Sequence, residues 1–264
     1  MNRIDQKFKE LRKKRKKAFI AFITAGDPDL KTTEQLVLAF EGAGVDIVEL
    51  GVPFSDPLAD GPTIQAASRR ALKKHVNLEN ILATVKRIRQ RSQIPIALMT
   101  YYNPVFHYGE DRFARKAKAC GVDGIMVPDL PPEEGHGLIR AARENGLATV
   151  FFLAPTTTRH RMKHIVNAST GFIYYVSLTG VTGARQKLPR TITGQVKLAR
   201  KLTHKPICVG FGISTPAQVK MAAKVADGVI VGSAIVNTIA QNKGKKQLVP
   251  NVARFVQKLS RNLS

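Results

Sequence analysis

Short apolar segments alternate with helical patterns along the whole chain. Eight of these segments are rich in Val, Ile and Phe, and a helical pattern or a short turn follows each one. The predicted strands cover residues 18–24, 46–51, 94–101, 124–128, 148–153, 171–177, 206–210 and 228–231. Strands that are apolar on both faces are typical of a parallel sheet covered by helices. The pattern therefore restricts the chain to the α/β folds.

The number of strand–helix units favours a closed barrel over an open sheet. Eight units in 264 residues predict an α/β fold, a single-domain (β/α)8 TIM barrel with an extra N-terminal helix, spanning residues 1–264. Residues 1–17 form the basic N-terminal helix, and residues 178–190 form a long Gly/Thr-rich loop after strand six. No GxGxxG turn follows the first strand, which removes the main support for a dinucleotide-binding fold. No linker or shift in composition marks a second domain.

The predicted helices lie between these strands. They cover residues 1–15, 32–41, 62–91 with an interruption near residue 75, 111–119, 133–144, 159–167, 193–202, 216–224 and 249–263. Residues 233–239, after the last strand, are predicted to form only a short turn.

The formal charge of +23 is unusual and attracts polyanions in general. However, Lys and Arg are spread over all the predicted helices but the one at residues 32–41, and no aromatic residues alternate with them as a stacking surface. We interpret the charge as a solvated basic surface, and nucleic acid is not an expected partner.

Cysteine use and hydropathy indicate a reducing compartment. Cys120 and Cys208 fall in a helix end and in a strand and do not resemble a pair, so the cytoplasm is the expected location. No apolar run reaches the length of a membrane span, so no membrane is expected. The basic residues 13–17 precede a short apolar run, but Asp27-Pro28-Asp29 follows where a signal-peptide cleavage site would need small residues.

One carboxylate lies in the second predicted strand, and another follows that strand closely. Glu49 lies where the strand runs into the core, and Asp60 comes just before Gly61-Pro62 at the start of a helix. A buried acid with a second acid nearby is suited to proton transfer. Considered in isolation, Glu49 is more readily a surface acid at a strand end and Asp60 a helix N-cap.

The loops after strands seven and eight are short and rich in Gly and Ser. Phe211-Gly-Ile-Ser214 and Gly232-Ser233 precede helix starts, which is where TIM barrels commonly bind phosphate through backbone N–H groups. Tight turns alone would also explain these glycines. Two such turns in the two loops concerned favour a phosphate site.

Other kinds of chemistry lack candidate residues. No lysine lies in a predicted strand or at its end, which excludes a Schiff-base nucleophile. His160 and His164 are spaced for a metal, but they lie in a basic helix without a nearby carboxylate, so we interpret them as surface residues and expect no metal site. Acid/base catalysis by carboxylates on a phosphorylated substrate remains.

Several motifs carry a resemblance to a known family, in the same order and over nearly the whole chain. They are Phe22-Ile-Thr-Ala-Gly-Asp-Pro28, Glu49-Leu-Gly-Val-Pro-Phe-Ser-Asp-Pro-Leu-Ala-Asp-Gly-Pro-Thr-Ile-Gln65, Met99-Thr-Tyr-Tyr-Asn-Pro104, Val127-Pro-Asp-Leu-Pro131, Ser177-Leu-Thr-Gly-Val-Thr-Gly-Ala-Arg185, Gly210-Phe-Gly-Ile-Ser214 and Val231-Gly-Ser-Ala234. This set resembles the α subunit family of tryptophan synthase. The segment from Glu49 to Gln65 is the most specific part.

The resemblance implies a (β/α)8 lyase that cleaves indole-3-glycerol phosphate to indole and glyceraldehyde 3-phosphate, in a retro-aldol reaction without metal or Schiff base. It assigns Glu49 as the general acid/base and Asp60 as the carboxylate that bonds the indole N–H. The resemblance also assigns substrate contacts to Phe22, Thr100, Val127, Leu153, Tyr174 and Thr182, the last of these in a mobile lid loop at residues 178–190. The phosphate site would consist of Gly183, Phe211, Gly212, Ile213, Gly232 and Ser233.

The resemblance also implies a partner. In this family the α subunit pairs with a β subunit that carries pyridoxal phosphate, the complex is an α2β2 heterotetramer, and indole passes between the sites through a tunnel. The α chain itself needs no cofactor. The residues that match the contact surface are Pro53, Asp56, Asn103, Pro104 and Pro131.

Two other functions are alternatives to the lyase. The first is a barrel used mainly for binding, either as an allosteric partner of the β subunit or as a polyanion-binding protein. The second is the barrel enzyme that makes indole-3-glycerol phosphate, which would require a catalytic lysine at a strand end. The high charge departs from what the family leads us to expect, but it changes none of the site residues.

Overall fold

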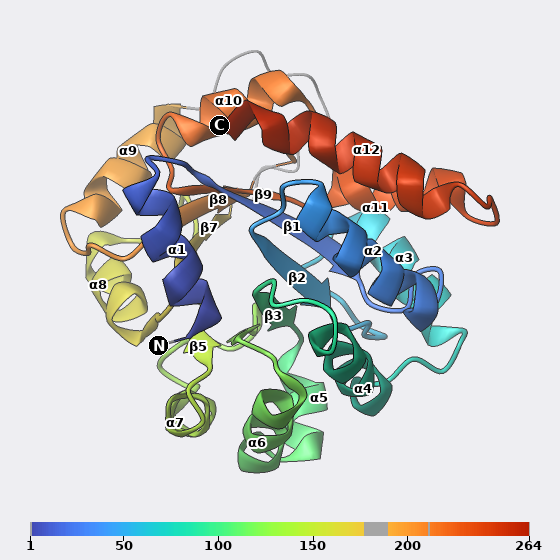
Figure 1. Cartoon of the computed structure of the whole chain (residues 1–264). Coiled ribbons are helices and arrows are strands. Elements are labelled where there is room, and N and C mark those ends of the chain that lie inside the picture. Colours follow the sequence, from blue (N-terminus) through green and yellow to red (C-terminus); the bar gives the residue numbers. More distant parts are fainter. Residues whose placement is uncertain (1, 177–189, 211, 264) are drawn as a thin grey trace.

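Parallel strands curl into a barrel whose outside is covered by helices (Figure 1). The structure is a computed structural model that describes residues 2–176, 190–210 and 212–263. The strands are β1 Ala18–Thr24, β2 Ile47–Gly51, β3 Ile96–Met99, β4 Gly124–Met126, β5 Ala148–Thr149, β6 Phe152–Leu153, β7 Ile173–Val176, β8 Ile207–Gly210 and β9 Gly228–Val231. The predicted lid at residues 178–190 lies, apart from its last residue, outside the described residues.

The helices follow the strands in alternation. They are α1 Arg3–Lys13, α2 Leu30–Gly42, α3 Pro62–Leu72, α4 Leu78–Arg89, α5 Tyr102–Tyr108, α6 Glu110–Cys120, α7 His136–Glu144, α8 Arg159–Ala168, α9 Arg190–Arg200, α10 Pro216–Ala223, α11 Ser233–Asn242 and α12 Leu248–Ser260, with a final 3-10 turn at Arg261–Leu263. In the described residues, none combines the length and the hydropathy needed to cross a membrane.

The sheet closes on itself through the fifth barrel strand. The strand order is β5-β4-β3-β2-β1-β9-β8-β7-β6, so β5 and β6 form its two ends, yet only residues 150 and 151 separate them in the chain. The N–H of Val150 donates to the carbonyl of Ile125, and the N–H of Tyr174 donates to the carbonyl of Phe151. Thus β5 and β6 are two halves of one strand, and the predicted eight-stranded barrel is confirmed.

Helix α1 covers the end of the barrel at which the strands begin. Its buried residues Ile4, Phe8 and Leu11 pack with the inward-facing side chains of the barrel interior, and Phe8 contacts Phe172 with ring centroids 5.8 Å apart. Because all strands are parallel, their carboxyl ends meet at the opposite end. The polar residues at those ends therefore face one common mouth.

Two helices differ from the sequence prediction. Residues 102–108 form helix α5 where only a loop was predicted; the Asp129 carboxylate accepts a hydrogen bond from the N–H of Tyr102 and so stabilises its start. Residues 233–242 form helix α11 and not a short turn, since no glycine or proline interrupts the segment before Gly244. Strand β3 is shorter than predicted.

Candidate active site

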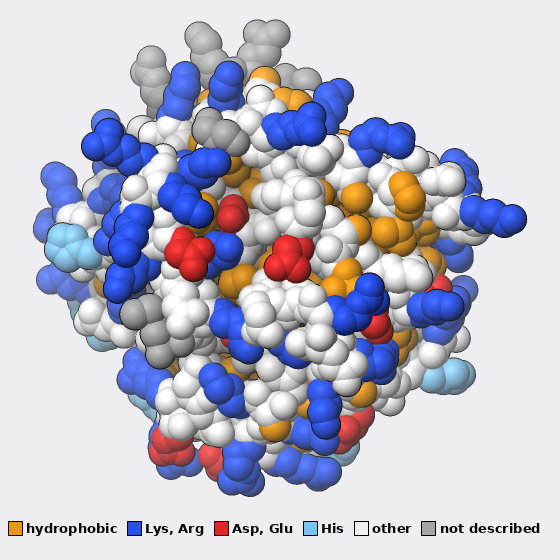
Figure 2. All heavy atoms as spheres, in the orientation of Figure 1, with side chains coloured by type: hydrophobic (Ala, Val, Ile, Leu, Met, Phe, Trp, Pro, Cys, Tyr) orange, Lys and Arg blue, Asp and Glu red, His pale blue; other side chains and the backbone are white. Residues whose placement is uncertain are grey.

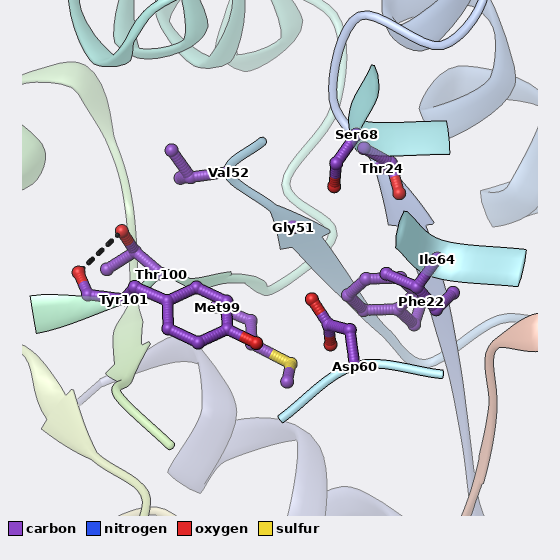
Figure 3. A pocket seen from close by; sticks show the side chains of 10 residues that line it. All are labelled: Phe22, Thr24, Gly51, Val52, Asp60, Ile64, Ser68, Met99, Thr100 and Tyr101. Atoms are coloured by element: carbon purple, nitrogen blue, oxygen red, sulfur yellow. Dashed lines mark hydrogen bonds between the residues drawn. The ribbon is translucent and has the colours of Figure 1, made fainter. Parts of the chain in front are cut away.

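A pocket opens at the carboxyl ends of strands β1, β2 and β3, beside the start of α3 (Figure 3). Its walls are Phe22, Thr24, Gly51, Val52, Asp60, Ile64, Ser68, Met99, Thr100 and Tyr101. In Figure 3, Asp60 lies between Phe22 on one side and Met99 with Tyr101 on the other. The Asp60 carboxylate thus lies between the rings of Phe22 and Tyr101 and the flexible side chain of Met99. Such a pocket can hold a planar aromatic ring against apolar surface and bind its polar group with the carboxylate.

Glu49 points into the barrel interior and is completely buried. It pairs with Phe22 of β1 and with Ala97 of β3 in the parallel ladders. Neither carboxylate oxygen has a hydrogen-bond partner among the described residues. Burial alone raises the pKa of Glu49 from its ordinary 4.5 to about 8. The interpretation of Glu49 as a surface acid is therefore wrong, and the carboxyl group holds its proton at neutral pH.

Asp60 is held at the mouth by Tyr101. The hydroxyl of Tyr101 accepts a hydrogen bond from the N–H of Ala59 at 2.9 Å and interacts with the Asp60 carboxylate. The Tyr101 ring also stacks on Phe54, with centroids 5.1 Å apart. Asp60 is not an N-cap, because α3 begins after Gly61 without a side-chain cap. Burial raises the pKa of Asp60 to about 6, while the bond from Tyr101 opposes this rise.

The inward-facing wall differs from the sequence prediction at two positions. Val127 packs in the cluster between the sheet and its outer helices, and Leu153 packs in a similar cluster against α8. Their chain neighbours Met126 and Phe152 join the cluster inside the barrel. Successive side chains of a strand point to opposite faces, so an assignment displaced by one residue selects the outer face. The predicted pocket roles of Val127 and Leu153 are corrected accordingly.

Of the other predicted substrate contacts, Phe22 and Thr100 line the pocket. Tyr174 points inward with Phe152, at a ring centroid separation of 5.1 Å. Desolvation, with Glu49 the next cause, raises the pKa of Tyr174 well above its ordinary value. A Cβ atom on Gly210 would lie 2.7 Å from the Tyr174 hydroxyl, so this glycine leaves room for the tyrosine. Thr182 lies outside the described residues.

The predicted phosphate site lies at the turns after β8 and β9. Gly232 and Ser233 start helix α11, whose first N–H groups have no acceptor within the helix. Gly212 has a φ of 66°, a left-handed conformation that favours glycine, and Ile213 is buried. The N–H groups of Ser214 and Thr215 both donate to Gln218. Gly183 and Phe211 lie outside the described residues.

The predicted partner contacts lie in three segments at the mouth: the loop after β2, helix α5 and the loop after β4. Asp56 and Asn103 are exposed, and Pro104 and Pro131 are partly exposed, whereas Pro53 is buried and can act only by shaping its loop. The loop after β2 and helix α5 also carry the exposed large hydrophobic side chains of the described residues. These are Leu58, which is 93% exposed, and Phe106, which is 69% exposed.

Some residues of the site were missed by the sequence analysis. Met99 and Ile64 form apolar walls, and the hydroxyl of Thr24 is buried without a partner among the described residues. Tyr101 was placed at a strand end without a role. Strict alternation along β3 from Ala97, which faces inward, would have identified Met99. The Tyr101 hydroxyl accepts its hydrogen bond from Ala59, which is distant in sequence, so no pattern in the sequence around Tyr101 indicates its role.

Comparison with known proteins decides the family. A sequence profile described as "Tryptophan synthase alpha chain" matches residues 8–264. The chain belongs to this family. The tryptophan synthase alpha chain of Geotalea daltonii is 53% identical over 246 residues, which cover 93% of each chain. That of a Thermoanaerobacter species is 47% identical over 259 residues, which cover 98% of each chain.

Solved structures agree with this assignment. Tryptophan synthase subunit alpha from Legionella pneumophila superposes with a TM-score of 0.93 at 37% identity, covering 100% of this chain and 98% of that one. A chain of tryptophan synthase from M. tuberculosis in an open form gives a TM-score of 0.90 at 33% identity, covering 100% of this chain and 99% of that chain. The predicted family and fold are confirmed.

A tryptophan synthase alpha chain is an enzyme subunit of tryptophan biosynthesis and works with a β subunit. Cleavage of indole-3-glycerol phosphate to indole is the activity of the alpha chain in this family. Pyridoxal phosphate is carried by the β subunit, which agrees with the prediction that this chain holds no cofactor. In the described residues, no group of three or more His, Cys, Asp or Glu side chains is arranged to hold a metal.

Proposed function

We propose that this chain cleaves indole-3-glycerol phosphate to indole and glyceraldehyde 3-phosphate, with Glu49 as proton donor and acceptor and Asp60 as the stabilising carboxylate. The observation that carries this proposal is the fully buried Glu49 beside the pocket, which holds its proton at neutral pH. Such a group can donate first and accept afterwards.

The reaction can be written with its protons balanced. The Glu49 carboxyl donates its proton to C3 of the indole ring, and the ring becomes positively charged. The ionised Asp60 accepts a hydrogen bond from the indole N–H and stabilises this charge. The Glu49 carboxylate then takes the proton of the hydroxyl on the adjacent carbon, while the carbon–carbon bond breaks and its electron pair returns to the ring. Indole and an aldehyde result, and Glu49 ends protonated.

Binding is supported by the walls of the pocket. Phe22 and Met99, together with Phe152 and Tyr174 deeper in the barrel, offer apolar surface to the indole ring in place of Val127 and Leu153. The N-terminus of α11 at Gly232 and Ser233, together with the turn at Gly212, is suited to the phosphate. The roles of Thr182, Gly183 and Phe211, and of a lid at residues 178–190, remain predictions.

The finer details of assembly and location are also proposals. We propose that two copies of this chain join β subunits in an α2β2 complex, through the loop after β2 and helix α5. Leu58 and Phe106 support this surface, because large apolar side chains are seldom exposed together without a partner. Cytoplasmic location is supported by Cys120 and Cys208, which are both free and buried.

Replacement of Glu49 by Gln tests the proposal directly. The amide keeps the size of the side chain but cannot exchange a proton, so we expect indole formation from indole-3-glycerol phosphate to fall by about 10²-fold or more. Glu144→Gln, on an exposed position of α7, is the matched control and should keep wild-type turnover. Wild-type turnover of a folded Glu49→Gln protein would contradict the assignment.

A further inference from the structure

The positive charge is distributed unevenly along the chain. Residues 18–144 contain 15 Lys and Arg against 16 Asp and Glu. Residues 1–17 contain nine Lys and Arg against two acids, and residues 145–264 contain 18 against the single acid Asp227. One half of the barrel and the N-terminal helix carry the whole surplus.

The fold brings part of this surplus together at the end of the barrel that α1 covers. There, the six consecutive basic residues 12–17 run from the last turn of α1 to the start of β1. Arg12 donates a hydrogen bond to the carbonyl of His204, and Lys17 and Arg200 both pair with Asp227. These contacts place the basic segment beside the loops that precede β8 and β9.

We call this region the basic face. Its members are Arg12, Lys13, Lys14, Arg15, Lys16, Lys17, Arg200, Lys201, Lys224 and Arg261. All are exposed except Lys17, which is half-buried. Lys16 and Lys17 line two shallow hollows on either side of the segment, one with Pro206 and Asp227 and one with Arg261. Three acids lie beside it, Glu10, Asp46 and Asp227, against ten basic residues, so positive charge dominates the face.

Figure 2 shows the molecule from the side of α1. Lys and Arg side chains crowd the left and the top of the view, over α1, α8, α9 and α10, whereas the lower edge, over α6 and α7, mixes basic with acidic side chains. The active-site mouth lies at the opposite end of the barrel, where the strands end. A phosphate bound at that mouth therefore does not account for the basic face.

The basic face lacks the features that other partners require. Stable protein interfaces have an apolar core, and stable membrane attachment usually adds an apolar anchor to charge. The exposed large hydrophobic side chains among the described residues, Leu58 and Phe106, belong to the mouth at the other end. Single-stranded nucleic acids are held by stacking on exposed aromatic rings, which this face does not offer. By contrast, a duplex carries closely and regularly spaced phosphates, which basic side chains alone can bind.

We propose that the basic face binds the phosphate backbone of a nucleic-acid duplex, without regard to sequence; the proposal departs from the expectation, drawn from the sequence, that nucleic acid is not a partner. Binding there leaves the mouth free, so the duplex acts as a scaffold that holds the enzyme and does not act as a substrate or inhibitor. The proposal is independent of the catalytic roles of Glu49 and Asp60. It predicts an association that weakens steeply with salt, because each neutralised phosphate releases bound cations.

Fluorescence anisotropy of a labelled RNA duplex of about 20 base pairs, measured from about 50 to 200 mM salt, tests the proposal. A charge-neutralised variant carries Lys→Gln changes at Lys13, Lys14, Lys16, Lys201 and Lys224, which are all exposed. A matched control removes five positive charges elsewhere through changes to Gln at Lys73, Lys86, Arg91, Arg115 and Lys116. Both variants should keep wild-type indole formation.

At about 100 mM salt we expect the first variant to lose tenfold or more in affinity, with a salt slope smaller by about two or more, and the control to lose less than about threefold. Equal losses in the two variants would show that only total charge matters and would overturn the proposal. Absence of wild-type binding at that salt concentration would overturn it as well. So would tighter binding to vesicles of phosphatidylcholine and phosphatidylserine than to the duplex.

Discussion

Glu49 and Asp60 differ in how they are buried, and this difference gives the two carboxyl groups different pKa values. Glu49 has no partner among the described residues and a pKa of about 8, whereas Asp60 is bonded by Tyr101 and has a pKa of about 6. The proposed reaction needs Glu49 protonated and Asp60 ionised. We therefore expect kcat/KM for indole formation to rise through about pH 6 and fall through about pH 8. A profile flat across this range would contradict the two roles.

Tyr101 is expected to tune Asp60. Its hydrogen bond favours the ionised carboxylate and lowers the Asp60 pKa, so Tyr101→Phe should move the acid limb of the pH profile to higher pH. Loss of one hydrogen bond corresponds to roughly a fivefold loss of kcat/KM on the acid limb, below about pH 6, and to a smaller loss at neutral pH. The control is Tyr102→Phe, which removes a hydroxyl that donates to Glu110. An unmoved acid limb in Tyr101→Phe would exclude this tuning role.

Burial of Glu49 should also cost stability at high pH. Below pH 4.5 the carboxyl group is protonated in the folded and the unfolded chain alike. Between pH 4.5 and about 8 the unfolded chain releases this proton while the folded chain keeps it, so the free energy of unfolding falls as the pH rises. Glu49→Gln removes the effect, and its stability relative to wild type should increase by ~4 kcal/mol across that window. Urea unfolding at pH 5 and pH 8 measures the change, and an equal difference at both values would contradict it.

At the scale of elements, the sequence predicts what depends on periodicity and misses what depends on tertiary contacts. The apolar runs predicted every barrel strand, because strands buried on both faces leave a strong signal. Helix α5 was missed since it is short and starts on the carboxylate of Asp129, which lies in another loop. The wall positions at Val127 and Leu153 were displaced by one residue, because continuous apolar strands do not reveal which side faces inward.

The loop after β2 and helix α5 together form a surface suited to the β subunit. Leu58→Ser and Phe106→Ser each remove an exposed apolar side chain, and we expect each to weaken binding to the β subunit by about tenfold or more. Titration calorimetry with the β subunit measures the affinity. Indole formation by the isolated chain should not change, and His204→Ser on an exposed loop at the other end should leave the affinity unaltered. Wild-type affinity in both apolar variants would place the interface elsewhere.

The whole molecule separates its functions between the two ends of the barrel. The mouth carries the acids, the apolar pocket and the proposed partner surface, while the other end carries α1 and the basic face. Arg3 of α1 and Arg89 of α4 both pair with the buried Asp123, which ties the helix to the barrel floor. Such ion pairs add specificity more than stability. The apolar contacts of α1 should therefore supply most of what this helix contributes to the stability of the barrel.

Phe8→Ala tests whether the covered end stabilises the barrel without taking part in catalysis. Phe8 is 7% exposed and packs on Phe172, so its truncation should cost ~3–5 kcal/mol. For a chain of this size that corresponds to a Tm lower by roughly 6–15 °C, measured by calorimetry. Phe106→Ala, which truncates a Phe that is 69% exposed, is the matched control and should leave the Tm nearly unchanged. Indole formation at 25 °C should stay within about twofold of wild type in both variants, because Phe8 lies at the far end of the barrel from the mouth and Phe106 does not line the pocket. A marked loss of turnover in folded Phe8→Ala would mean that the two ends are coupled.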